Sequence, residues 1–384
     1  MDLIDDLHLR EPWEALKAKT VPRHGSSIWY YFGGLALFFF AIQIVTGLLL
    51  LTYYRPTPEA AHQSVQMIVS KVPFGIVIRS IHAWTANILI AIVAIHLFSV
   101  FFMKSYRKPR AILWVTGMVL LLILLTFGFT GYLLPWTPTS YFATLIGTEL
   151  PREIPIFGDL LSEWLRGSKV ITGATLTRLY GLHVVLLPML ALAFVTIHVA
   201  ITSLLGSGVP DGAKIKGETR FLPDYLLGQS IVWLLGLAVL LIVAVFFPWP
   251  LGPAYNLAKP SAPPAGVHPE WYFLFFYQSL KYVPEWVAVT FYTLVLLFWT
   301  LVPWLDSPQV TAEGMTASRG VRPPRRTPPV WKSQLFTWIG VVFIAGMALL
   351  TTLAYFSITQ EKASAKVEQT SHSRLLPASD SAGK

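Results

Sequence analysis

Seven long runs of apolar residues alternate with shorter polar segments along the chain. They lie at about 28–54, 80–103, 112–135, 177–205, 227–249, 287–305 and 333–356. A helix needs about 20 apolar residues to cross the hydrocarbon core of a membrane, so each run is long enough to span it. The pattern predicts an all-α integral membrane protein with about seven transmembrane helices.

The polar segments divide the chain into regions. We expect an N-terminal arm with a surface helix (1–27), a four-helix bundle (28–205), a linker (206–226), a three-helix C-terminal domain (227–356) and a polar, disordered tail (357–384). Inside the bundle, the loop 136–176 contains "LPREIPIFGDLLSEWLRG". Its prolines and glycines separate apolar pieces that are typical of short interfacial helices.

Composition and charge agree with a membrane location. Only 13% of the residues are charged, against about 25% in soluble domains. Lys and Arg are concentrated in the N-terminal arm and the even-numbered loops, which the positive-inside rule places in the cytoplasm or its organellar equivalent. The net charge of +9 therefore reflects topology and lipid headgroups and not nucleic-acid binding. No signal or transit peptide is visible, which favours the bacterial plasma membrane.

The chain contains no cysteine. This excludes disulfides, cysteine-ligated iron–sulfur clusters and haem attached through a Cys-x-x-Cys-His motif. Any redox metal in this protein must be held by other side chains.

Four histidines lie in apolar runs: His82 and His96 in the second, His183 and His198 in the fourth. Separations of 14 and 15 residues place each pair on broadly one face of its helix, at levels about 21–23 Å apart. Both helices run from outside to inside, so His82 and His183 share the outer level and the other two share the inner one. Such pairs can hold two b-type haems, although interhelical hydrogen bonds or a proton relay are alternatives.

Glycines repeat this spacing in the first and third runs. Gly33 and Gly47 are 14 residues apart, and so are Gly117 and Gly131. A missing side chain lets a flat macrocycle or another backbone come close. Ordinary packing of small residues between membrane helices is the alternative.

Two arginines precede the outer histidines. Arg79 lies three residues before His82, and Arg178 five residues before His183. An arginine near the membrane boundary costs a few kcal/mol unless it is paired or reaches the interface. Haem propionates would be bidentate partners, and plain interfacial anchoring is the alternative.

The motifs "GGLALFFFAIQIVTGLLL", "IRSIHAW", "FTGYLLPW", "LTRLYGLH" and "PEWYFLFFY" together resemble cytochrome b of the Rieske/cytochrome b quinol-oxidising complexes. The resemblance covers about residues 20–350. The first half is similar to the photosynthetic branch of the family. In that branch the protein is divided into two chains, whereas here it is one fused chain. The resemblance implies a low-potential haem on His82 and His183 and a high-potential haem on His96 and His198. It also places Gln43, with both arginines, around the outer haem.

The triplet Pro-Glu-Trp occurs twice, around Glu270 and Glu285. The resemblance implies an outer quinol site built from Glu270, Tyr272 and Tyr277, near the helix at 136–150. A quinol that gives up two electrons also loses protons, and burial raises the pKa of a carboxylate so that it becomes a better base. We expect Glu270 to accept a proton, with a structural carboxylate as the alternative, and Glu285 to mark the membrane interface.

Some residues depart from the family pattern. Tyr31 stands where the photosynthetic branch attaches an additional haem through cysteine, so we expect no covalently attached haem. Ser99 replaces an arginine common near the inner haem, which leaves Arg107 or Arg110 as candidate partners of its propionates. Asp224 is a candidate proton donor of the inner quinone site or a solvated loop residue.

The resemblance implies a quinol:cytochrome c (or similar acceptor) oxidoreductase that runs a Q cycle coupled to proton translocation. One electron leaves through a Rieske iron–sulfur partner to a cytochrome c subunit, and the other crosses the two haems to an inner quinone site. A homodimer within a larger complex is expected. The alternative is a dihaem membrane anchor that wires another dehydrogenase to the quinone pool, and a haem-free transporter with relay histidines is a third hypothesis.

Overall fold

The structure is a computed structural model that describes residues 14, 16–210, 213–306 and 330–375. Within these residues seven helical segments are long and apolar enough to cross a membrane, which confirms the predicted fold class. They are α3 (Tyr31–Leu51), α5 (Gly75–Phe102), α6 (Ala111–Leu133), α9 (Gly173–Gly181) continued by η3 (Leu182–Leu186) and α10 (Leu187–Leu205), α11 (Leu226–Phe246), α13 (Glu285–Leu305) and α14 (Val330–Leu375).

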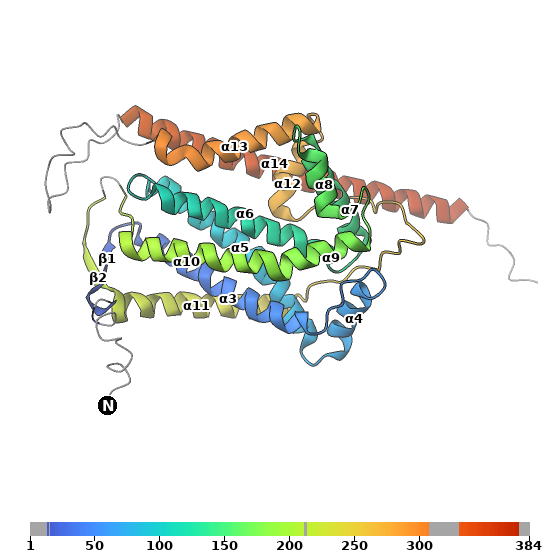
Figure 1. Cartoon of the computed structure of the whole chain (residues 1–384), viewed down its shortest axis with the longest axis horizontal. Helices are drawn as coiled ribbons and strands as arrows, with labels where there is room; N and C mark the ends of the chain where they lie inside the picture. The colour runs from blue at the N-terminus through green and yellow to red at the C-terminus, as the bar shows by residue number, and fades with distance from the viewer. Residues whose placement is uncertain (1–13, 15, 211–212, 307–329, 376–384) are drawn as a thin grey trace, which may run out of the picture.

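The long helices lie side by side with roughly parallel axes (Figure 1). α3 packs against α5, and α6 against α10. α11 packs on α3 and α5 at one edge, and α13 packs on α6 at the other. Large apolar side chains such as Met189 on α10 (66% exposed) and Leu234 on α11 (65% exposed) point away from the protein interior, as expected where lipid replaces water. The predicted domain boundaries stay a prediction.

Short elements cover the two ends of the helices. At one end lie α4 (Ala61–Lys71), α7 (Pro138–Glu149), η2 (Leu150–Glu153), α8 (Gly158–Arg166), η5 (Trp271–Phe273) and α12 (Leu274–Ser279). α7 and α8 are the short helices predicted within 136–176. At the opposite end are η1 (Ser27–Tyr30), η4 (Phe221–Tyr225) and the strands β1 (Thr20–Arg23) and β2 (Gly217–Arg220).

The strands join the N-terminal arm to the linker, a connection that was not predicted. β1 and β2 pair antiparallel, with Thr20 opposite Arg220. The expected surface helix of the arm is described only at Glu14 and at 16–18, which are helical. The rest of that expectation lies outside the described residues, as does the basic segment 307–329.

The prediction of a disordered tail is wrong for residues 357–375, which continue α14. Within this stretch, eight of the ten residues 360–369 are Ala, Glu, Lys or Gln, which are good helix formers. The ammonium of Lys281 also donates to Glu361 (2.8 Å) and to Ser357 (2.7 Å). α14 has 46 residues, about 69 Å of helix, which is more than twice the thickness of a hydrocarbon core. Residues 376–384 lie outside the described residues.

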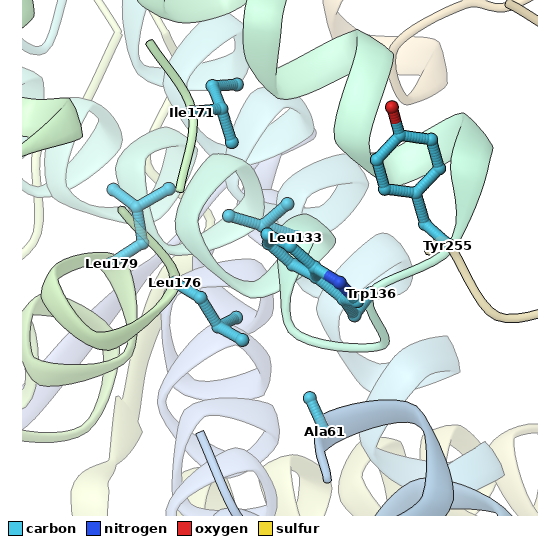
Figure 2. Close-up of a cluster of buried hydrophobic side chains, with 7 residues drawn as sticks. All are labelled: Ala61, Leu133, Trp136, Ile171, Leu176, Leu179 and Tyr255. Atoms are coloured by element: carbon cyan, nitrogen blue, oxygen red, sulfur yellow. The ribbon is translucent and has the colours of Figure 1, made fainter. Parts of the chain in front are cut away.

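A buried apolar cluster fixes the elements that close one end of the bundle. Figure 2 shows Leu133 and Trp136 at its centre, with Leu176 and Leu179 of α9 on one side and Ala61 of α4 on another. Trp136 is completely buried. The cluster therefore holds the end of α6, the start of the fourth span and α4 in one arrangement, directly beside the site described next.

Candidate functional site

Two histidines face each other at the end of the bundle that carries α4, α7 and α8. His82 lies on α5 and His183 lies in η3, and their ring centres are 6.5 Å apart. Metal–imidazole bonds are about 2.0–2.1 Å long, so two imidazoles that share one metal ion have ring centres about 6.5 Å apart. The observed separation therefore fits a metal ion held between the two rings.

The unequal spacing of the histidine pairs has a structural explanation. α5 is a regular α-helix between His82 and His96, which are 14 residues apart. The fourth span contains the π-helical turn η3, Leu182–Leu186, which includes His183. A π-turn takes up an extra residue within a helix, so 15 residues here cover about the same rotation as 14 in α5. The geometry brings His183 opposite His82 and leaves His198 near His96.

Each of the four predicted glycines faces one histidine ring. A Cβ atom built on these glycines would lie 2.7–3.4 Å from the nearest imidazole carbon. The pairs are Gly47 with His82, Gly131 with His183, Gly33 with His96 and Gly117 with His198. The glycines thus make room for the imidazoles themselves, and their contact with a macrocycle stays a prediction.

Three threonines that the sequence analysis missed contact the histidines. Thr46, Thr130 and Thr116 directly precede three of the glycines. Their hydroxyl oxygens lie 2.9, 3.1 and 2.9 Å from Nδ1 of His82, His183 and His198 respectively. The recurring dipeptide Thr-Gly, opposite histidines at the same depth, is the signal that could have found them.

These contacts fix the proton on the imidazole rings. The Thr46 hydroxyl donates its only proton to the Ile42 carbonyl (2.7 Å), so the Nδ1 of His82 must be the donor in its contact with Thr46. The Nε2 atom is then unprotonated and free to bind a metal ion. Among the described residues no group of three or more His, Cys, Asp or Glu is placed to hold a metal. Paired imidazoles fit haem, whose macrocycle supplies the remaining ligands.

One continuous cavity of about 550 Å³ joins the outer histidine pair to the motif Pro-Glu-Trp-Tyr. Its walls include His82, His183, Glu270 and Tyr272. Gln43 also lines it, and its buried side-chain oxygen has no hydrogen-bond partner among the residues that the structure describes. The lining is predominantly apolar, which suits a ring-shaped organic ligand with a few polar groups.

The two predicted arginines lie in different surroundings. Arg79 lines the cavity and donates to the carbonyls of Trp249 (2.7 Å) and Pro250 (3.0 Å). Arg178 is exposed, donates to the Trp164 carbonyl and is not among the described residues that line the cavity. Contact of either arginine with a propionate stays a prediction, and the geometry favours Arg79.

Glu270 lies at the wall of the cavity, just before η5. Burial raises the pKa of its carboxyl from 4.5 to about 7, so that it can exchange protons near neutral pH. The Tyr272 pKa is raised, first by burial and then by Glu270, which keeps the phenol protonated. Glu270 also lines a smaller cavity of about 20 Å³ with Tyr132, enough for one water molecule.

Neighbouring residues hold this motif in place. A Cβ atom on Gly128 would lie 2.3 Å from the Tyr272 hydroxyl, so only glycine leaves room for this tyrosine. The indole of Trp271 donates to the side-chain oxygen of Asn87 on α5 (2.9 Å). Tyr277 was predicted at the same site, but it is not among the described lining residues, and its hydroxyl donates to the Val267 carbonyl (3.1 Å).

The candidates at the opposite end have protein partners. Arg107 forms an ion pair with the fully buried Asp306 (2.8 Å). Arg110 donates to the backbone carbonyl of Leu205 (3.0 Å) at the end of α10. Asp224 lies 3.6 Å from Arg220, with half of its side chain exposed. These contacts anchor loops, and roles toward a haem or a quinone stay predictions.

Two further residues at this end were singled out by their departure from the family pattern. Tyr31 stacks on Tyr225 with ring centres 5.1 Å apart. Ser99 donates to the His96 carbonyl (2.7 Å). The absence of a covalently attached haem stays a prediction.

Comparisons with known proteins identify the family. Residues 16–205 match the family described as "Cytochrome b/b6/petB", and residues 257–322 match "Cytochrome b(C-terminal)/b6/petD". The "Cytochrome bc complex cytochrome b subunit" of Chlorobaculum thiosulfatiphilum is 45% identical over 348 residues, 88% of this chain and 76% of the relative. "Cytochrome b6" of Heliobacterium mobile is 42% identical over 197 residues, 51% of this chain and 92% of the relative.

A solved structure has the same fold along most of the chain. It is described as "Hyperthermophilic respiratory Complex III", with a TM-score of 0.71 and 28% sequence identity, and the match covers 93% of this chain and 100% of that one. The predicted resemblance is confirmed, including the similarity of the first half to cytochrome b6. The chain belongs to the cytochrome b family, with b6-like and C-terminal regions fused in one polypeptide.

Proposed function

We propose that this chain is the quinol-oxidising cytochrome b subunit of a bc-type complex. The observation that carries the proposal is the single cavity that contains both the outer histidine pair and Glu270. A quinol in this cavity would lie between a proton acceptor and the position of a haem. When bound, the two haems would supply one-electron transfer between the outer and inner sides of the membrane.

Glu270 is assigned the role of proton acceptor for the quinol. With a pKa near 7, it is substantially ionised at neutral pH and can take the proton of a quinol hydroxyl. The small cavity that it shares with Tyr132 offers a water molecule to which the proton can pass. Tyr272 remains protonated and can orient a quinol oxygen by donating a hydrogen bond.

The apolar wall serves to exclude water from the reaction. Most of the cavity surface is apolar, and residues of α4, α7 and the segment 249–252 are part of its wall. Water exclusion strengthens the interactions between the few polar groups and the ligand. It also keeps the quinol from exchanging protons with water except through Glu270.

The wider assignment follows from the family. The electron acceptors are a Rieske iron–sulfur protein and a cytochrome c subunit. The chain also contains an inner quinone site, takes part in a Q cycle and forms a homodimer within the complex. We place the protein in the bacterial plasma membrane with its N terminus in the cytoplasm. The relatives named as subunits of a bc complex and of Complex III support a multi-subunit assembly.

The alternative function is a dihaem membrane anchor. The variant Glu270→Gln distinguishes it from a quinol-oxidising subunit. Glu285→Gln is a matched control, because this second Pro-Glu-Trp glutamate is exposed and does not line the cavity. We expect Glu270→Gln to slow quinol-dependent cytochrome c reduction by the purified complex about 100-fold or more, with an unchanged b-haem spectrum. Equal rates for Glu270→Gln and the control would contradict the assignment and favour an anchor.

A further inference from the structure

The four histidines differ in the hydrogen-bond contacts of their Nδ1 atoms. At the outer level, Nδ1 of His82 contacts Thr46 (2.9 Å) and Nδ1 of His183 contacts Thr130 (3.1 Å). At the inner level, Nδ1 of His198 contacts Thr116 (2.9 Å). Nδ1 of His96 is buried and has no hydrogen-bond partner among the described residues.

The sequence explains the exception. Thr46, Thr130 and Thr116 each precede the glycine that faces the histidine, whereas Phe32 precedes Gly33 opposite His96. Glycine lets the two helices approach, and the preceding residue then lies beside the imidazole. Phenylalanine cannot accept a hydrogen bond at this place. The difference between the outer and inner histidine pairs therefore comes from one position, Phe32, where the repeated Thr-Gly pattern is broken.

The threonines act on the metal-binding atom through the ring. A hydroxyl that accepts the Nδ1 proton draws it away from the imidazole and makes Nε2 a stronger electron donor. A stronger donor stabilises the oxidised, more positive iron relative to the reduced iron. Each threonine contact thus lowers the reduction potential of a haem held by that histidine.

We propose that these threonines are positioning residues that separate the two haem potentials, two contacts at the outer pair against one at the inner pair. This inference rests on the haem-binding part of the proposed function. It gives the outer site the lower potential, which is the direction needed for an electron to pass inward. It assigns that difference to hydroxyl groups of this chain rather than to a partner subunit.

Thr46→Val is the cleanest test, because valine keeps the shape of threonine and removes the hydroxyl. Thr130 is less suitable, since the Phe127 carbonyl also lies beside the His183 ring. In a redox titration of the purified complex, followed by b-haem absorbance, we expect the outer potential to rise by about 59 mV, which corresponds to a tenfold change for a one-electron couple. The inner potential stays unchanged, and Thr46→Ser restores the wild-type value. An unchanged outer potential in Thr46→Val would overturn the proposal.

A gain-of-contact variant tests the same idea at the inner site. Phe32→Thr places a hydroxyl before Gly33, and Phe32→Val is its matched control for lost packing. We expect the inner potential to fall in Phe32→Thr relative to Phe32→Val, even if Thr46→Val proves unstable. Equal inner potentials in these two variants would overturn the proposal. Both measurements need bound haem but no quinol turnover, so their failure is distinguishable from failure of the quinol assignment.

Discussion

The pH dependence of quinol oxidation tests the environment of Glu270 quantitatively. Burial raises the pKa of this carboxyl from 4.5 to about 7. Because the ionised form accepts the proton, activity should increase as the pH rises through this value. The ionised fraction grows from about 9% at about pH 6 to about 91% at about pH 8, which predicts an approximately tenfold increase in rate. A carboxyl with its ordinary pKa would be ionised throughout and would give a flat profile.

The assay is the initial rate of quinol oxidation by the purified complex at saturating electron acceptor, between about pH 5.5 and 8.5. Glu270→Gln removes the titrating group, so its residual rate should lack the step near pH 7. Ionisation of the quinol itself affects both proteins equally, and the ratio of their rates isolates Glu270. A ratio that is constant with pH would show that Glu270 does not titrate near neutral pH during quinol oxidation.

Two further predictions concern the packing around the site. Gly128→Ala should displace Tyr272 and lower quinol oxidation about tenfold with haem content unchanged. Its control is Gly346→Ala, where an added Cβ atom has no described atom within 4 Å, and this variant should keep wild-type activity. Asp306→Asn should destabilise the protein by about 3–5 kcal/mol, because it removes the buried carboxylate that pairs with Arg107 (2.8 Å) and Lys104 (3.8 Å). Thermal unfolding in detergent, against the same Gly346→Ala control, would show a clearly lowered Tm, and an unchanged Tm would contradict this role.

Features that depend on depth in the membrane could be predicted from the sequence. The seven helices follow from apolar length, and the two levels of His82, His183, His96 and His198 follow from helix direction and rise per residue. These quantities are local or additive along the chain. Glu270 was singled out in a different way, through the resemblance of its motif to the family.

Features that depend on helix rotation and long-range pairing could not be predicted in this way. Hydropathy does not say which neighbour a side chain faces, so the contact of Thr46 with His82 was missed. For the same reason the sequence did not distinguish Arg79, which lines the cavity, from Arg178, which is not among the described lining residues. The pairing of β1 with β2 joins segments that are about 200 residues apart and have no local signal. The tail was interpreted as disordered from its polarity, although residues 360–369 are rich in helix formers and Lys281 forms an ion pair with Glu361.

The central claim, that four histidines in two pairs bind two haems, is tested most directly by haem content per polypeptide. A pyridine hemochromogen assay on the purified complex, with acid–acetone extraction and a dithionite-reduced spectrum, measures both number and attachment. We expect two extractable b-type haems per chain, and one fewer when His82 is replaced by alanine. An absence of haem would return the histidines to packing or relay roles, and a third haem that resists extraction would contradict the reading of Tyr31.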